Sequence, residues 1–235
     1  MDAGLSCRET FRRLKGIGER PEALDAVLIS HEHTDHVAGL VSLAGALNIP
    51  VYLTKLTQRA IAAEGPDLVK QLPVLEVFGA GQKFALRDLE VEPFTVPHDA
   101  VDPVAFCFSA GGIRVGLCTD LGYIPDSVKV HLCGCHCLVL ESNHDLDMLK
   151  VGPYPWSVKQ RVMSRTGHLS NSAVADFLTQ DYDGAAEVLV LAHLSENNNH
   201  PEIARLVAAE ALARRAFRPR LVISSQRAPT ELFQF

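Results

Sequence analysis

The chain has 235 residues, of which 47% are hydrophobic and 21% are charged, and its formal net charge at pH 7 is -6. A globular chain of this length can bury roughly 70–75% of its unfolded surface without a disulfide or a structural metal. The negative charge argues against a polyanion coating the whole surface, and no apolar run reaches the ~18 residues of a membrane span. Six cysteines without a secretory signal favour reduced thiols, so we expect a cytoplasmic protein with no membrane partner.

Helices and strands are expected to alternate at both ends of the chain. The first third is expected to contain helices at 7–14, 37–46 and 56–63 and strands at 26–30 and 51–53. The middle third has short β-like runs between turns, at 74–77, 83–86, 89–94, 105–109 and 113–118. The last third returns to strands at 138–140, 187–192 and 221–224 and to helices at 157–164, 172–178 and 202–215. This order predicts an α/β fold, a four-layer αβ/βα sandwich in a single domain over residues 1–235.

The most informative motif is His-Glu-His-Thr-Asp-His at residues 31–36, directly after an apolar run. Its crowded ionisable side chains repel or desolvate one another unless a cation binds them. Alternate residues of an extended loop share a side, so His31 and His33 can bind one ion, while Asp35 and His36 can reach a second. Zinc accepts imidazole nitrogen and carboxylate oxygen at about 2.0–2.2 Å. The alternative is a polar loop whose histidines are simply solvated.

Four later residues are candidates for further ligands or for catalysis: His98, Asp120, His168 and His193. Each alone has an ordinary interpretation as a satisfied core or turn residue. Three of them together would complete a two-ion site, with His98 on the first ion, His193 on the second and Asp120 bridging both.

The His-x-His-x-Asp-His spacing resembles the signature of the metallo-β-lactamase superfamily. The resemblance implies the metallo-β-lactamase fold over essentially the whole chain. It places metal ligands at His31, His33, Asp35, His36, His98, Asp120 and His193. It also matches Asp2 to the superfamily's first motif, an aspartate at a strand end. Relatives carry a strand before that aspartate, so we expect a fold that lacks its first strand and exposes a sheet edge.

A series of later segments is similar to the WalJ-like (YycJ-like) hydrolases, a bacterial group related to ribonuclease Z and reported as DNA exonucleases. The matching segments are 140–145, 148–149, 152–155, 159–161, 167–171 and 193–198. The resemblance implies a phosphodiesterase, most specifically a DNA exonuclease, with nucleic acid as its partner. Its cofactors are expected to be two divalent ions that activate a water, zinc or manganese with iron as an option. A homodimer is kept as a further option.

The candidate catalytic residues are Asp35, Glu141 and His168. Two metal ions alone would also suit cleavage of a lactam, a thioester or a lactone. The choice of substrate class must therefore come from Glu141 and His168. By resemblance to ribonuclease Z, His168 donates a proton to the leaving alkoxide or binds the scissile phosphate, and Glu141 orients it. The alternative is that Glu141 caps a turn and His168 hydrogen-bonds to backbone.

Polar residues at predicted helix starts are candidates for phosphate binding, because free N–H groups there attract anions. They are Ser170, Asn171, Ser195 and Asn197. Three basic residues, Lys159, Arg161 and Arg165, could follow a phosphate backbone. Ordinary helix capping is the alternative for each of the four polar residues.

Two other functions compete with the nuclease. One is a small-molecule hydrolase that cleaves a thioester, a lactone or a cyclic phosphodiester on the same fold. The other is a non-hydrolytic protein, such as a redox di-iron module. Di-iron relatives usually replace a histidine by an acidic ligand and carry a flavin domain, and this chain shows neither feature. The segments around Glu141 and His168 favour the nuclease.

Overall fold

The computed structural model describes the backbone of residues 1–235 and every side chain except that of Pro66. The chain divides into two compact units. Unit 1 comprises residues 1–82, 100–104 and 231–234, and unit 2 comprises residues 83–99, 105–230 and 235. The single domain expected from the sequence stays a prediction.

Unit 1 is built on a parallel sheet in the order β1-β2-β3. Its strands are β1 (Val27–Leu28), β2 (Pro50–Thr54) and β3 (Val74–Phe78). Its helices are α1 (Cys7–Gly16), the 3-10 helix η1 (Pro21–Ala23), α2 (Thr34–Val37), α3 (Leu40–Leu47), α4 (Lys55–Glu64) and α5 (Pro66–Lys70). Buried apolar residues of β1, β2 and α3, among them Leu43, Val51 and Leu53, form one core. This core holds the segment after β1 in place.

Unit 2 contains a mixed sheet in the order β10-β9-β8-β7-β6-β5-β4. The strands are β4 (Phe84–Leu86), β5 (Leu89–Thr95), β6 (Val104–Ala110), β7 (Ile113–Cys118), β8 (Cys137–Glu141), β9 (Val188–Ala192) and β10 (Arg220–Ile223). Strands β7 to β10 pair in parallel. Strands β8 and β9 are nearly continuous apolar runs, the pattern of parallel strands covered on both faces.

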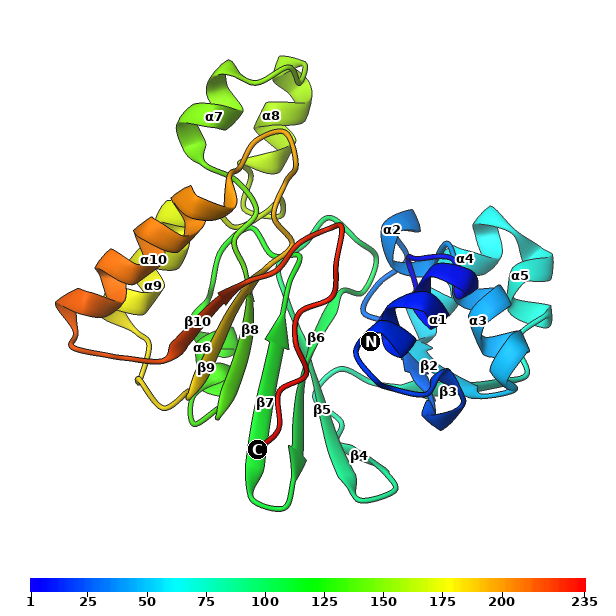
Figure 1. Cartoon of the computed structure of the whole chain (residues 1–235). Helices are drawn as coiled ribbons and strands as arrows, with labels where there is room; N and C mark the ends of the chain where they lie inside the picture. The colour runs from blue at the N-terminus through cyan, green and yellow to red at the C-terminus, as the bar shows by residue number, and fades with distance from the viewer. The chain divides into compact units, whose positions relative to one another are not determined.

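The helices of unit 2 are α6 (Asp126–Leu132), α7 (Leu146–Val151), α8 (Trp156–Val162), α9 (Asn171–Gln180) and α10 (Pro201–Arg214). Helices α9 and α10 pack along each other, while α7 and α8 project beyond the ends of the strands (Figure 1). We call residues 146–162 the helical arm. Among the described residues, none of the helices has the length and apolar character needed to cross a bilayer.

The parallel strands of unit 2 bring polar residues to one edge. Asp120 follows β7, Glu141 ends β8 and His193 follows β9. The carboxyl ends of parallel strands meet at the same edge of a sheet, where ligands bind in open α/β folds. The helical arm follows β8 and therefore lies beside this edge.

The expected elements agree with the structure except at short helices. The sequence did not predict α2, α5, α6 or α7, which have four to seven residues each. Helices this short carry too few turns to show a helical repeat of apolar residues. The prediction of an extended loop was wrong for Asp35 and His36, because they lie on α2.

Candidate active site

His31 and His33 leave β1 on an extended segment of unit 1, and their ring nitrogens face each other. His31 Nε2 and His33 Nδ1 are 2.9 Å apart. On the other side of its ring, His31 Nδ1 lies 2.9 Å from Ser30 Oγ. The contact with Ser30 directs Nε2 of His31 toward His33. Both imidazoles therefore present one nitrogen to the same point, as two ligands of one ion do.

Asp2 fixes the orientation of His36. Its Oδ2 accepts hydrogen bonds from His36 Nδ1 at 2.8 Å and Ser30 Oγ at 2.9 Å, and its Oδ1 accepts one from the Ser30 N–H at 2.8 Å. His36 Nε2 then lies 3.6 Å from Asp35 Oδ2. A metal-binding histidine usually donates the N–H of its other ring nitrogen to a group such as a carboxylate.

The first residues of the chain lie directly on the metal-binding motif. The Ala3 N–H donates to the His36 carbonyl oxygen at 2.7 Å. A Cβ on Gly4 would lie 1.5 Å from the Asp35 carbonyl oxygen, so only glycine permits this approach. The segment therefore positions Asp2, which the family resemblance had singled out.

Two residues at the strand ends of unit 2 have unusual backbones. Asp120 has φ 62° and His193 has φ 59°, both in the left-handed region. Residues with side chains rarely adopt it, and such strain gathers at functional positions. Asp120 is also buried, at 3% exposure. These two conformations support the functional assignment of both residues.

His98 and His193 both direct Nε2 toward Asp120. The Nδ1 of His98 donates to the Gly167 carbonyl oxygen at 3.1 Å, and the Nδ1 of His193 donates to Glu141 Oε1 at 2.8 Å. The opposite nitrogens of the two rings lie 3.9 Å and 3.4 Å from Asp120 Oδ1. Burial lowers the pKa of His98, which favours the neutral form that binds metals. A carboxylate between two imidazoles suits the predicted bridging role.

Glu141 connects His168 to His193. Its Oε1 accepts hydrogen bonds from Nδ1 of both rings at 2.8 Å, and its Oε2 accepts the N–H groups of Leu121 and Leu169 at 3.0 and 3.1 Å. Glu141 is completely buried. Burial opposes its charge, but the hydrogen bonds from the two histidines outweigh this and lower the pKa of Glu141. Burial likewise opposes a charged His168, but the hydrogen bond and charge of Glu141 prevail and raise the pKa of His168.

The donor atoms fit divalent metal ions. In unit 2, Asp120, Glu141, His168 and His193 place ligand atoms within 4.8 Å of one another. In unit 1, the motif after β1 supplies three imidazoles and a carboxylate. Zinc, manganese and iron all accept this mixture of nitrogen and oxygen. Each oxygen of Glu141 already accepts two hydrogen bonds, which makes Glu141 a less suitable ligand than Asp120 or His193.

Ser170 and Asn171 have structural roles at the start of α9. Ser170 Oγ accepts the Ala173 N–H at 3.2 Å and so caps the helix. Asn171 is 2% exposed, and its amide bonds to Ser142 Oγ at 2.7 Å and Asn199 Oδ1 at 2.9 Å. This burial argues against the expected contact of Asn171 with phosphate.

Ser195 and Asn197 lie in the loop after β9. Ser195 Oγ accepts the N–H of Asn198 at 3.2 Å, which stabilises the loop. Asn197 is exposed, and its Nδ2 donates to Tyr154 Oη at 3.3 Å. The structure thus connects this loop to the helical arm.

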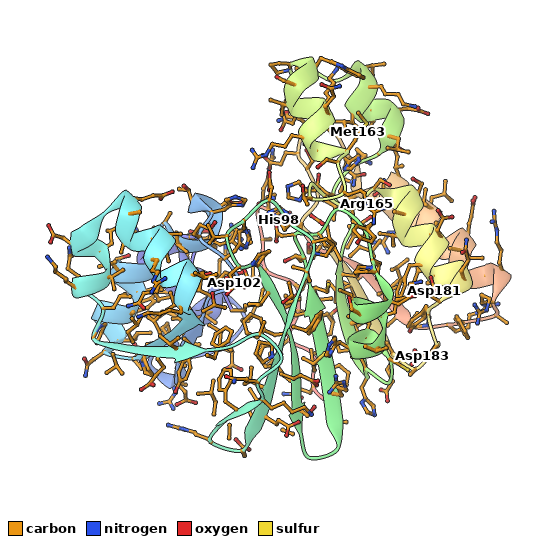
Figure 2. The ribbon with its side chains drawn as sticks, turned by 180° about the vertical axis from the view of Figure 1, so that it is seen from behind. His98, Asp102, Met163, Arg165, Asp181 and Asp183 are labelled. Carbon is orange, nitrogen blue, oxygen red and sulfur yellow. The ribbon has the colours of Figure 1, made fainter. Side chains whose placement is uncertain are left out.

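The three basic residues Lys159, Arg161 and Arg165, on α8 and just after it, make three different contacts and do not form a single phosphate-binding row. Lys159 is 8% exposed and its Nζ donates to the Lys150 carbonyl oxygen at 2.7 Å, so its predicted phosphate contact was wrong. Arg161 pairs with Asp99. The Arg165 guanidinium lies 4.0 Å from the centre of the Tyr123 ring. Figure 2 shows Arg165 at the same end of unit 2 as His98.

His144 is a buried histidine outside the predicted catalytic and metal-binding residues. It is 1% exposed, and among the described residues neither ring nitrogen has a hydrogen-bond partner. Burial lowers the pKa of His144 to about 4. Its carbonyl oxygen accepts the Asn171 N–H at 2.9 Å, so its backbone supports the start of α9.

We expect His144→Leu to stabilise the protein at acid pH relative to wild type. Between pH 6.5 and 4 the unfolded chain takes up a proton on His144 that the folded chain does not, so wild-type stability falls through this window. Over this window the free energy of unfolding of wild type should fall by about 3 kcal/mol. Urea unfolding at pH 7 and pH 4 measures it. A difference between variant and wild type that does not change with pH would contradict the expectation.

The family follows from a comparison with known proteins. The model of the beta-lactamase superfamily domain matches residues 1–194. This chain belongs to the beta-lactamase superfamily. The predicted family and the predicted fold are therefore confirmed.

Two relatives of this superfamily member cover most of its length. Exodeoxyribonuclease YycJ of Bacillus anthracis is 36% identical over 223 residues, which are 92% of this chain and 81% of the relative. Exodeoxyribonuclease WalJ of Streptococcus pneumoniae (serotype 2, strain D39) is 34% identical over 215 residues, 91% of this chain and 79% of the relative.

A solved structure agrees with the fold of this superfamily member. The metallo-beta-lactamase fold protein YhfI of Bacillus subtilis has a TM-score of 0.68 at 21% identity, with 95% of this chain and 82% of that chain covered. With the two relatives, the superfamily match makes the chain a metal-dependent hydrolase, as predicted.

Proposed function

We propose that this hydrolase is an exodeoxyribonuclease that cleaves phosphodiester bonds of DNA. The observation that carries the proposal is the buried Glu141 carboxylate, which accepts Nδ1 of both His168 and His193 at 2.8 Å. Glu141 thereby connects His168, which is suited to proton transfer, with His193, which is a predicted metal ligand. The two exodeoxyribonuclease relatives support the same substrate.

The proposed cofactors are two divalent ions, zinc or manganese. Their ligands are the residues predicted from the sequence: His31, His33, Asp35, His36, His98, Asp120 and His193. When bound, the ions supply an acidified water as nucleophile and neutralise charge on the phosphate oxygens.

His168 is the proposed proton donor to the leaving oxygen. Its Nδ1 is held by Glu141, so Nε2 is the atom that carries the transferred proton. The raised pKa of His168 keeps that proton in place to a higher pH than an ordinary imidazole does. The charge of Glu141 also stabilises the imidazolium. Ser195 and Asn197 are proposed to contact the substrate from the loop after β9.

The substrate can be tested directly. The purified chain is incubated with end-labelled single- and double-stranded DNA and RNA, with zinc or with manganese. We expect DNA to shorten from an end and RNA to be cleaved more slowly. Cleavage of no polymer, together with turnover of a thioester or lactone, would overturn the proposal in favour of a small-molecule hydrolase.

We expect His168→Ala to lower kcat on DNA by about 100-fold, because loss of a general acid removes that order of rate. The metal content, measured by elemental analysis, should equal that of wild type. His200→Ala is the matched control, since His200 is exposed and caps α10. Loss of metal from His168→Ala would instead make His168 a ligand.

A further inference from the structure

A polar cavity of about 420 Å³ opens beside His168 and His193 in unit 2. Its other walls come from Tyr154 and Val162 of the helical arm and from the loop 194–198. Pockets for small ligands have about 300–1,000 Å³, so the cavity has room for a nucleoside. The proposed function uses the two histidines and gives Ser195 and Asn197 a contact with the substrate, but it gives Tyr154 and the other walls no role.

The chemistry of the walls favours a neutral, planar, polar ligand. Asn143, Asn197 and Gln226 contribute amides, Ser195 a hydroxyl and Tyr154 an aromatic ring. The described lining contains no lysine or arginine, and Glu196 adds a carboxylate that repels phosphate. Amides hydrogen-bond to the edge of a nucleobase, and aromatic rings stack on its face.

Tyr154 lies at the cavity wall on a restricted backbone. It lies between Pro153 and Pro155, which restrict the backbone on both sides of it. Its Oη accepts a hydrogen bond from Asn197 Nδ2 at 3.3 Å. A Cβ on Gly152 would lie 2.4 Å from Asn198 Oδ1, so the arm and the loop are in close contact. The ring is thus positioned before any ligand binds, which lowers the entropic cost of binding.

We propose that this cavity binds the base of the terminal nucleotide next to the phosphodiester bond that is hydrolysed, with the Tyr154 ring as the stacking surface. The proposal rests on the proposed nuclease function, since it assigns a subsite to the same substrate. His168 lines the cavity, so a base bound there would lie next to the proposed proton donor.

The test compares two single-stranded DNA oligonucleotides with the metal-loaded enzyme. One has an intact terminal nucleotide at the end from which the enzyme degrades, and the other has an abasic residue there. Stacking of one base changes binding by about tenfold to hundredfold. We expect wild type to prefer the intact end by that factor in kcat/KM, and Tyr154→Ala to reduce the preference to near one.

Two variants separate stacking from other effects. Tyr154→Phe retains the ring and should keep the preference. Trp156→Ala removes an aromatic residue of the same arm that is 61% exposed and outside the cavity lining, and it should also keep the preference. The melting temperature of each variant reports on the fold.

The outcomes distinguish the two proposals. Cleavage of both oligonucleotides with equal kcat/KM by wild type would overturn the base subsite and leave the nuclease function intact. A preference that survives in Tyr154→Ala would also overturn it, whatever Trp156→Ala does. Cleavage of neither oligonucleotide would overturn the nuclease function, and the subsite with it.

Discussion

Glu141→Gln is expected to lower kcat/KM on DNA by about 10³-fold and the free energy of unfolding by about 3 kcal/mol. All four groups that contact this carboxylate are donors: Nδ1 of His168 and of His193, and the N–H groups of Leu121 and Leu169. A glutamine must place its NH₂ group against one of these pairs of donors. One pair is then left buried without an acceptor, which costs about 1–3 kcal/mol for each group.

The loss of activity has two sources that act together. His168 loses the anion that holds its proton, and a missing general acid costs about 10²–10⁴-fold. His193 loses the support of its Nδ1, and such a loss lowers metal affinity or activity by about 10–100-fold. Both effects depend on the same Oε1 atom, so they do not simply multiply.

The measurement combines kinetics with urea unfolding, and Glu92→Gln is the matched control. Glu92 is a half-buried carboxylate on β5 of the same sheet, bonded to Arg114 at 3.0 Å. Its variant should lose stability while kcat/KM stays within about twofold. Wild-type activity in Glu141→Gln would show that His168 and His193 need no carboxylate.

The metal-binding motif could be predicted from sequence because its residues are neighbours in the chain. The spacing of His31 and His33 already places two imidazoles on one segment, and the structure brings their nitrogens to 2.9 Å. The partners that orient them are distant. Asp2 reaches His36 from 34 residues away, and only the family resemblance had pointed to it.

The pairing of Glu141 with His168 also followed from resemblance, since 27 residues separate them. The sequence could not show that Glu141 also accepts a hydrogen bond from His193, which lies 52 residues further along the chain. It arises because β8 and β9 are parallel neighbours that end at the same edge. Asn171 was given a substrate role from its place at a predicted helix start and Lys159 from its spacing with other basic residues, but both side chains are buried.

The helical arm could be predicted only in part from periodicity. Helix α8 was expected at 157–164, whereas α7, with six residues, is too short for a clear repeat. The Pro-Tyr-Pro segment between the two helices belongs to the family motif at 152–155, but the sequence does not show that it lines a cavity. Its meaning depends on the loop after β9, which the chain reaches only some 40 residues later.

Asp120→Asn is expected to lower kcat/KM on DNA by about 10³–10⁴-fold while the fold stays intact. The proposed bridging carboxylate faces Nε2 of His98 and His193 at 3.9 and 3.4 Å. Removing its charge weakens binding of both ions, and stabilisation of charge by bound metal is worth several kcal/mol in the transition state. Elemental analysis should find fewer than two ions per chain.

Asparagine is the informative replacement because of the backbone. Asp120 has φ 62°, a conformation that asparagine tolerates well and alanine does not. Asp120→Ala would therefore combine lost charge with strain, whereas Asp120→Asn changes only the charge and should melt close to wild type. Excess manganese should restore part of the activity if weakened metal binding is the cause. Full metal content with full activity in Asp120→Asn would remove Asp120 from the ligand set, and a large fall in melting temperature would make its role structural.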